Sequence, residues 1–297
     1  MKTAIGIDIG GTNIKGVLIN ENGKILQEMS QPTNDNKDGK WKEKVFQTAK
    51  KIKDDFRGHV DCIGLASPGL ANDTNEFIAY MPDRLSGLEN FNWSVFLNQT
   101  THVLNDAHAA LLAEASFGTI KGFKNAILLT LGTGVGGGLL INGELFQGMN
   151  QMAGHFGHIS INTHDDEQSI LGMPGSLEYA LGNYSVNRRS HGRYENTDEL
   201  VNAYLKNEPL ATWLWLDLVR KLSIAIASFS NSISPEIVVL TGGITHANQA
   251  LFEPLKSFLD IYEFKPNGNA MPVVSSKFSD LSGAVGAAAF AFKQNEN

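Results

Sequence analysis

The stretch Ala4–Ile19 reads AIGIDIGGTNIKGVLI, and a second stretch, Ala126–Ile141, reads AILLTLGTGVGGGLLI. In each stretch, aliphatic runs flank a group of glycines, a pattern that predicts two strands joined by a glycine turn. Asn-Glu-Asn-Gly at 20–23 and Asn-Gly at 142–143 then signal a second turn, which leads into a third strand. Because this pattern occurs in both halves of the chain, it indicates an internal duplication.

The rest of the chain alternates between strand and helix patterns, which predicts an α/β protein. Strands are expected at Cys62–Ala66, His102–Leu104 and Ile237–Leu240, and helices at Lys42–Phe56, from Asp106 to Gly118, at Ala211–Ser232 and at Gly283–Phe292. We place a domain boundary near Glu114–Lys121, giving domains 1–115 and 116–297, with the final helix able to pack back across the cleft between them. The polar segment Ser185–Asn196 is expected to be a solvated loop.

Composition limits the classes of function. The 297 residues carry a formal charge of −7, and an acidic surface repels nucleic acid, so we expect no nucleic-acid partner. The single cysteine, Cys62, excludes an internal disulfide and a thiolate zinc cluster. With no apolar run of about 18 residues and no signal-peptide pattern, we expect no membrane association and a cytoplasmic location.

The tip of the first hairpin has the composition of a phosphate-binding turn. Gly10 and Gly11 allow the backbone to approach a bulky anion, and their amides and the Thr12 hydroxyl can donate to phosphate oxygens. Asp8 would repel phosphate unless a cation lies between them, which points to Mg²⁺ held through water. The alternative is a plain hairpin turn, but a carboxylate within an apolar strand needs a reason.

The second hairpin carries Gly132-Thr133-Gly134 at its tip. It matches neither a P-loop, which needs Gly-Lys-Ser/Thr, nor a dinucleotide-binding turn, which needs a helix after the glycines. Two glycine hairpins facing each other across a cleft would hold a polyphosphate from both sides. Gly242 and Gly243 follow another expected strand, where they suit either an adenine or ribose lying on the backbone or a structural turn.

Asp106 has two possible roles where an expected strand gives way to a helix. As an N-cap it would accept hydrogen bonds from helix amides, which lowers the pKa of a carboxyl group and weakens it as a base. As a general base it would orient a hydroxyl group and take its proton late in phosphoryl transfer, where positioning supplies most of the rate. Because the chain also carries three phosphate-type turns, we favour the role of Asp106 as a general base.

These motifs, in their order and spacing, resemble those of the ROK family of sugar kinases and sugar-responsive repressors, within the actin-like ATPase superfamily. The resemblance covers nearly the whole chain and rests on DIGGT at 8–12, SPG at 67–69, NW at 92–93, NDAHAALLAEASFG at 105–118, LGTGVGGGLLINGELFQG at 131–148, AGHFGHI at 153–159, GMPGSLE at 172–178 and LTGGI at 240–244. It implies two actin-like, ribonuclease H-like domains with an active-site cleft between them.

The resemblance also implies ATP- and Mg²⁺-dependent phosphorylation of a sugar hydroxyl, usually O6 of a hexose such as glucose, by a homodimer. Asp106 would be the catalytic base. Phosphate and nucleoside positions would be Asp8, Gly10, Gly11, Thr12, Gly132, Thr133, Gly134, Gly242 and Gly243. Sugar positions would be Pro68, Gly69, Asn92, Asn105, His155, His158 and Glu178. The repressor branch carries an N-terminal winged helix, for which a phosphate turn at residue 8 is expected to leave no room.

Two departures from the family pattern fall near the sugar. His155 stands where the family has a glutamate that holds a ring hydroxyl. Ser169, Leu171 and Ser176 stand where it has three zinc-binding cysteines, and because such side chains are poor zinc ligands we expect no structural zinc. Because of these departures, two alternative functions remain: an N-acylhexosamine kinase of the N-acetylmannosamine type, and a non-catalytic sugar-binding pseudokinase. An intact Asp106 argues against the second.

Overall fold

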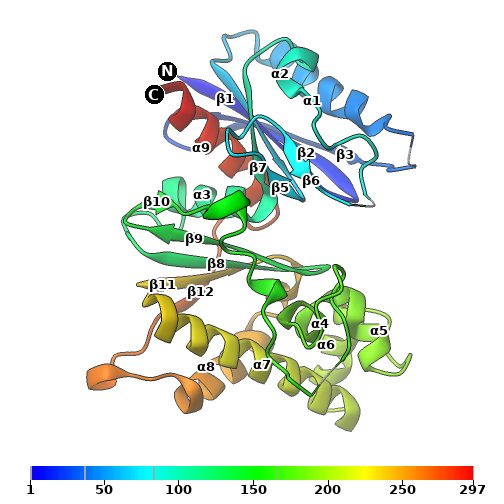
Figure 1. The fold of residues 1–297 in the computed structure, drawn as a ribbon, viewed down its shortest axis with the longest axis vertical. Coiled ribbons are helices and arrows are strands. Elements are labelled where there is room, and N and C mark those ends of the chain that lie inside the picture. The colour runs from blue at the N-terminus through cyan, green and yellow to red at the C-terminus, as the bar shows by residue number, and fades with distance from the viewer. Residues whose placement is uncertain (1, 37, 83, 165, 297) are drawn as a thin grey trace. The chain divides into compact units, whose positions relative to one another are not determined.

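Both glycine stretches form the predicted hairpins. The first consists of β1 (Thr3–Ile9), β2 (Asn13–Asn20) and β3 (Ile25–Pro32), and the second of β8 (Ala126–Leu131), β9 (Val135–Ile141) and β10 (Glu144–Leu145). In each case the glycine turn separates the first two strands, and the asparagine-containing turn leads into the third. The internal duplication read from the sequence therefore corresponds to two hairpins of the same design (Figure 1).

The computed structural model describes residues 2–36, 38–82, 84–164 and 166–296. Its contacts divide the chain into two compact units. Unit 1 comprises Met1–Phe123, Gly138–Ala153 and Ser276–Asn297, and unit 2 comprises Lys124–Gly137 and Gly154–Ser275. This division differs from the two continuous domains, 1–115 and 116–297, that the sequence led us to expect, because the chain contributes to unit 1 three times.

The other predicted elements are confirmed within a few residues at each end. In unit 1 they are accompanied by short strands and a short helix, giving α1 (Trp41–Phe56), β4 (Cys62–Ser67), β5 (Leu70–Ala71), β6 (Ile78–Tyr80), α2 (Trp93–Phe96), β7 (Thr101–Asn105), α3 (Asp106–Phe117) and α9 (Ser282–Glu296). Unit 2 contains α4 (Leu177–Leu181), α5 (Val186–Arg189), α6 (Thr197–Leu205), α7 (Pro209–Ile233), β11 (Ile237–Thr241), α8 (Gln249–Tyr262) and β12 (Val273–Ser275).

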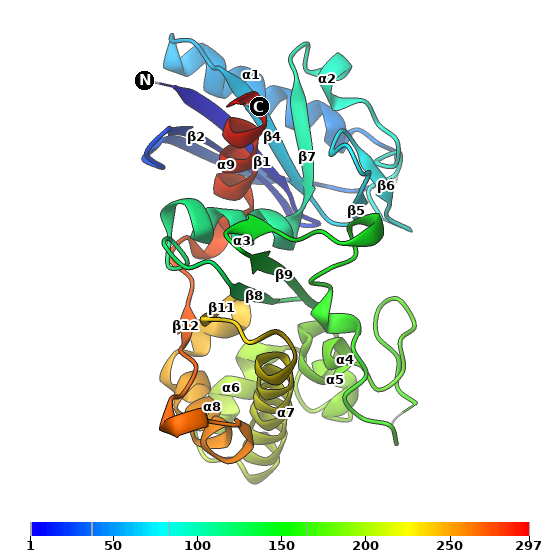
Figure 2. The same cartoon turned by 60° about the vertical axis from the view of Figure 1, so that its left-hand side comes forward.

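The sheet of unit 1 has the strand order β3-β2-β1-β4-β7, with β1 parallel to β4 and antiparallel to β2. Because strand side chains alternate between faces, Ile5, Ile7 and Ile9 point to one face, where they form a core with α1. Ala4 points to the other face and packs on α9. The same alternation places Asp8 on the α9 side of the sheet. Figure 2 shows α9 lying beside β1.

Helix α9 lies in direct backbone contact with the sheet. A methyl group added to Gly6 of β1 would come within 1.8 Å of the Ala284 carbonyl oxygen, and one added to Gly64 of β4 within 1.9 Å of that of Ala287. Only glycine fits at such positions. The final helix therefore belongs to unit 1, which explains why residues from both ends of the chain share one unit.

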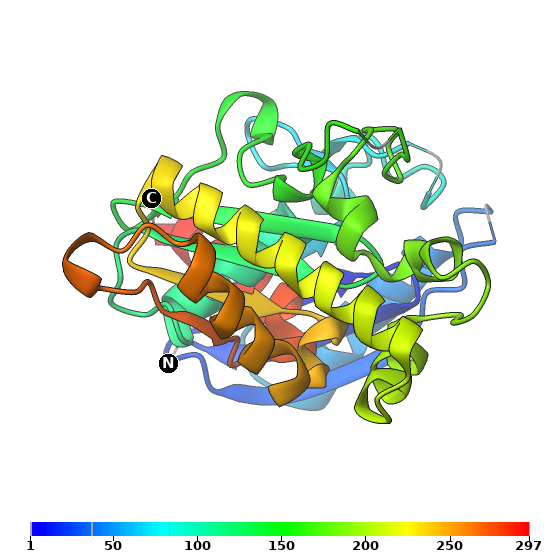
Figure 3. The same cartoon turned by 90° about the horizontal axis from the view of Figure 1, so that it is seen from below.

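The second sheet has the strand order β10-β9-β8-β11-β12, and β11, in unit 2, runs parallel to both β8 and β12. Helices α7 and α8 pack side by side (Figure 3). No helix in the described parts of the chain is long and apolar enough to cross a membrane.

The prediction of a solvated loop at Ser185–Asn196 is wrong. Val186–Arg189 forms the helix α5, and Ser190 and Tyr194 are buried. The Ser190 hydroxyl accepts a hydrogen bond from the Tyr194 amide at 3.0 Å, which closes the turn after the helix. Burial lowers the pKa of Arg189, whose Nε donates to the Ser185 hydroxyl. Despite its charged composition, the segment buries a residue about every fourth position, at Val186, Ser190 and Tyr194.

Candidate functional site

The first hairpin presents unused backbone donors at its tip. The Gly10 amide donates to the Asn13 carbonyl oxygen at 3.0 Å, and the carbonyl groups of Gly10 and Thr12 accept from Thr33 at 2.6 and 2.8 Å. Gly11 and Thr12 are exposed, and their amides donate to no other described residue. Successive free amides form a concave anion-binding turn, so the geometry suits the predicted phosphate contact.

An arginine that the sequence analysis missed lies against this tip. A methyl group added to Gly11 would come within 2.0 Å of Nη2 of Arg84, so the guanidinium group lies directly over the Gly11 backbone. No carboxylate in the described parts of the chain pairs with Arg84. Arg84 lies in an irregular loop, where no spacing or periodicity indicates which distant backbone a side chain will reach.

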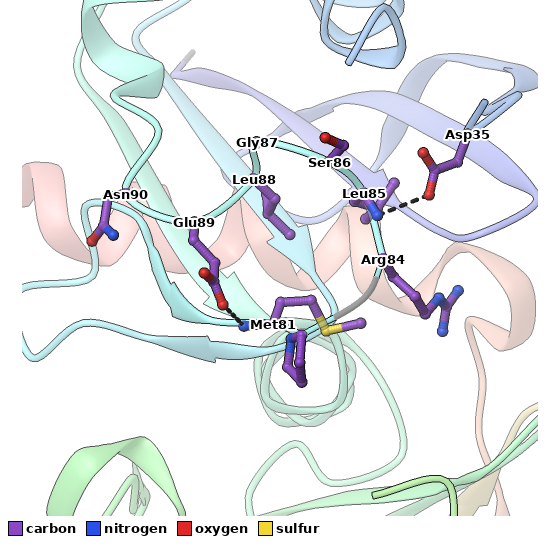
Figure 4. A pocket seen from close by; sticks show the side chains of 10 residues that line it. Asp35, Met81, Arg84, Leu85, Ser86, Gly87, Leu88, Glu89 and Asn90 are labelled. Atoms are coloured by element: carbon purple, nitrogen blue, oxygen red, sulfur yellow. Dashed lines mark hydrogen bonds between the residues drawn. The ribbon is translucent and has the colours of Figure 1, made fainter. Parts of the chain in front are cut away.

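Arg84 also lines a pocket of about 540 Å³ formed by the loop 81–90 and Asp35 (Figure 4). The Asp35 carboxylate accepts from the Leu85 amide at 2.8 Å, and that of Glu89 accepts from the Met81 amide at 2.6 Å. These bonds hold the loop that carries the guanidinium group. The pocket is polar, and none of the predicted sugar positions lines it.

The Asp8 carboxylate lies close to a second carboxylate, that of Asp106. Burial, and after it repulsion by Asp106, raise the pKa of Asp8 to about 7, while Lys15, its cross-strand neighbour, opposes the shift. A methyl group added to Gly283, in the first turn of α9, would come within 2.6 Å of the Asp8 carboxylate. Two carboxylates that repel each other in one unit suit a shared cation.

This arrangement fits Mg²⁺ better than a metal held by protein alone. No group of three or more histidine, cysteine or acidic side chains in the described residues is placed to hold a metal. Mg²⁺ usually takes only one or two carboxylates, with water and substrate phosphates completing its shell. Asp8, with Asp106 nearby, offers that number of ligands beside the hairpin tip.

The N-terminus of α3 shows which residue caps the helix. The cap is Asn105, whose side-chain oxygen accepts from the amides of Ala107 and His108 at 2.9 and 3.2 Å. Asp106 is the first helical residue and is partly exposed, and its carboxylate accepts from the Ala107 amide at 2.8 Å. Asn105 therefore fills the capping role that the sequence analysis weighed for Asp106.

The predicted sugar positions of unit 1 are brought together only in part. The Asn105 side-chain amide donates to the Gly69 carbonyl oxygen at 3.0 Å, which ties the turn that follows Pro68 to the start of α3. Asn92 instead caps α2 by accepting from the Val95 amide at 2.9 Å. In the described parts of the chain no hydrogen bond joins Asn92 to Gly69 or Asn105.

The second hairpin, in unit 2, has a tip like that of the first. The Gly132 amide donates to the Gly134 carbonyl oxygen at 3.0 Å, whereas the amides of Thr133 and Gly134 donate to no described residue. Gly242, with φ of +95°, lies so close to Leu131 that an added methyl group would come within 2.5 Å of the Leu131 carbonyl oxygen. The glycine turn after β11 therefore adjoins this tip, as the nucleoside and phosphate predictions require, and around Gly243 the space is open.

The two histidines of AGHFGHI lie side by side in unit 2. Their rings are stacked with centroids 6.2 Å apart and planes 16° from parallel. Nδ1 of His158 is buried and has no hydrogen-bond partner among the described residues. Gly157 lies against Val135 of β9, where an added methyl group would come within 2.0 Å of the Val135 carbonyl oxygen. The histidine loop therefore packs on the second hairpin just after its tip.

Comparison with known proteins decides the family. A sequence model of the ROK family matches residues 4–294. The chain belongs to the ROK family. It is 28% identical to a glucokinase of Halalkalibacterium halodurans, covering 99% of this chain and 96% of that protein. It is 26% identical to an N-acetyl-D-glucosamine kinase of Haemophilus influenzae, covering 96% and 97%. It matches the crystal structure of a ROK hexokinase from Thermus thermophilus with a TM-score of 0.84 and 25% identity, covering 99% of each chain.

The match confirms the actin-like α/β fold that the sequence motifs implied. Within this ROK protein, the positions of the family's zinc cysteines have other tasks. Ser169 closes a turn through bonds of 2.9 and 3.0 Å with Met173, and the Ser176 hydroxyl caps α4 by accepting from the Tyr179 amide at 3.1 Å. Leu171 is about half exposed. Hydrogen bonds therefore shape the segment that zinc organises in the typical family pattern.

The raised pKa of Asp8 predicts that its charge destabilises the ligand-free protein. Since the folded state binds this proton more tightly than the unfolded state, the unfolding free energy falls as pH rises from about 4 to about 7. A pKa shift from 3.8 to about 7 corresponds to a loss of at most about 4 kcal/mol in the free energy of unfolding. Because Asp8 is partly exposed and lies near the N-terminus of α9, we expect a loss of about 1–3 kcal/mol. We expect Asp8→Asn to be more stable than wild type by that amount above pH 7, and by little near pH 4.

Urea denaturation of ligand-free protein across pH 4–8 measures this difference. Asp54→Asn, an exposed acid on α1, is the matched control and should track wild type. In an Asp106→Asn background the advantage of Asp8→Asn should shrink, because the repelling charge is gone. A stability difference that does not vary with pH would contradict the prediction.

Proposed function

We propose that the protein transfers the γ-phosphoryl group of ATP to a sugar hydroxyl, O6 of a hexose, with Asp106 as general base. The observation that carries the proposal is the arrangement at the start of α3, where Asn105 caps the helix, so that capping does not require the neighbouring Asp106 carboxylate. Membership of a family with curated sugar-kinase relatives supports the same reaction class.

The phosphates are proposed to bind the two glycine tips. Each tip offers two successive free amides, Gly11 and Thr12 in unit 1 and Thr133 and Gly134 in unit 2. Arg84 adds a cation at the first tip, where negative charge builds up on the transferred group.

Mg²⁺ would be held by Asp8, through water, with Asp106 contributing to the negative field. When bound, it would supply positive charge that offsets the negative charge of the phosphates. Asp8 is ionised more readily beside such a charge, because the repulsion and burial that raise its pKa are then offset. The base Asp106 meanwhile orients the acceptor hydroxyl and takes its proton as the new bond forms.

The acceptor is proposed to contact Gly69, Asn105, His155, His158 and Glu178, the sugar positions that the family resemblance implies. Asn105 has one amide hydrogen left after bonding Gly69, enough for one hydroxyl group. The buried, unpartnered Nδ1 of His158 offers another polar contact. His155 offers one donor and one acceptor where a glutamate would accept from two hydroxyls, so the second candidate acceptor is an N-acylhexosamine.

A coupled assay of ADP release across about twenty sugars, with ATP and Mg²⁺, tests the function. We expect turnover with at least one free or N-acylated aldohexose and none with a pentitol. A protein that binds ATP and a sugar by calorimetry, yet releases no ADP with any of them, would be a sugar-binding pseudokinase.

Replacement of the base should separate chemistry from binding. We expect Asp106→Asn to lower kcat by about 10²–10⁴-fold, because the hydroxyl loses its proton acceptor. Sugar affinity should change by only about twofold, since the amide keeps an oxygen acceptor. Asp54→Asn is the control for loss of one negative charge. A variant with undiminished kcat would exclude Asp106 as the base.

The substitution His155→Glu tests whether residue 155 determines which sugar the protein accepts. Restoring a carboxylate should raise kcat/KM for unsubstituted glucose relative to its N-acylated analogue by about tenfold, the worth of one additional charge-assisted hydrogen bond. His164→Glu, at an exposed position on the following loop, is the matched control. If His155→Glu and wild type rank the same sugars in the same order and ratio, His155 does not determine specificity.

A further inference from the structure

Glu178 joins two segments of unit 2 through its carboxylate. It lies in the first turn of α4 and is buried, with 6% of its surface exposed. Oε1 accepts from the Val135 amide at 3.3 Å, and Oε2 accepts from the Ile170 amide at 3.1 Å. One side chain thus links the second glycine hairpin, just after its tip, to the loop that stands in place of the zinc segment.

The hairpin is shaped to admit this carboxylate. A methyl group added to Gly134 would come within 2.3 Å of Oε1 of Glu178, so a side chain at that position would displace it. On the other side of the tip, the amides of Asn183 and Tyr184 donate to the carbonyl groups of Gly132 and Thr133 at 3.0 and 3.2 Å. Segments at both ends of α4 therefore hold the hairpin.

We propose that Glu178 is a positioning residue for the phosphate hairpin, in addition to the sugar contact assigned to it above. By holding the Val135 amide, it fixes the backbone immediately after Thr133 and Gly134, whose amides donate to no described residue. This inference rests on the proposed function, since it concerns how the hairpin is prepared for phosphate.

A single carboxylate can serve both roles. Its two oxygens offer about four acceptor sites, of which the two backbone amides use two. A sugar hydroxyl can therefore bind without releasing Val135 or Ile170. Sugar and hairpin then share one charged group, so that sugar binding and nucleotide binding are linked through Glu178.

The test is nucleotide affinity in the absence of sugar, where a side chain that only contacts sugar has no influence. Glu178→Gln keeps the shape but replaces one acceptor oxygen with a donor, so one of the two backbone amides loses its partner. We expect the affinity for Mg²⁺ and a non-hydrolysable ATP analogue, measured by calorimetry, to fall about 5- to 30-fold. Glu199→Gln is the matched control, because the Glu199 carboxylate also accepts from a backbone amide, that of Glu195, but on the surface.

Equal nucleotide affinity in Glu178→Gln and wild type, with weakened sugar binding, would overturn the proposal. A second measurement uses wild type alone. The Val135 amide should exchange its hydrogen slowly in ligand-free protein, and fast exchange would also overturn the proposal. Because the exchange readout needs neither nucleotide nor turnover, it stands even if the proposed kinase activity fails.

Discussion

Direct backbone packing of α9 is the constraint on which the site in unit 1 depends. Gly6 lets α9 rest on β1, and an added methyl group on Gly286 of α9 would come within 1.6 Å of the Ala109 carbonyl oxygen of α3. One helix of small residues therefore fixes β1, which ends in the glycine hairpin, relative to α3, which begins with the proposed base. The first turn of α9 also abuts Asp8, through Gly283. A larger side chain on this face would move both carboxylates.

The charged side chains that this packing brings together are energetically unfavourable in the absence of a ligand. Burial and Asp106 both oppose ionisation of Asp8, and Lys15 offsets them only in part because it is also bonded to Asp280. Arg84, at the hairpin tip, has no described carboxylate partner. Such a set of unbalanced charges is characteristic of functional sites, where a ligand supplies the missing counter-charge. Here a divalent cation and a polyphosphate together would do so.

Local sequence patterns were enough to predict the helices, the strands and many of the candidate site positions. They did not predict contacts between segments that are distant in the sequence. Glycines between aliphatic runs encode the hairpins, and Gly118 ends α3 as expected. No periodicity indicates that α9 joins the first unit, because its close fit depends on Gly6 and Gly64 of other strands. The sequence also could not predict that Arg84 reaches Gly11, or that Asn105 caps α3 in place of Asp106. Both depend on where the folded backbone places these side chains. The assignment of site residues stays a prediction, which the structure supports by placement.

In unit 2 the proposed sugar-binding side chains are connected to the phosphate hairpin through Val135. Gly157 packs against the Val135 carbonyl oxygen, and Glu178 accepts a hydrogen bond from the Val135 amide. The central claim is that this framework and the carboxylates of unit 1 serve phosphoryl transfer to a sugar. Phosphorus NMR of a mixture of protein, Mg²⁺, ATP and glucose or an N-acylhexosamine tests it most directly. The account predicts a new phosphate monoester on O6 of the sugar, formed in step with ADP. ATP that stays intact, or that yields only inorganic phosphate, would contradict it.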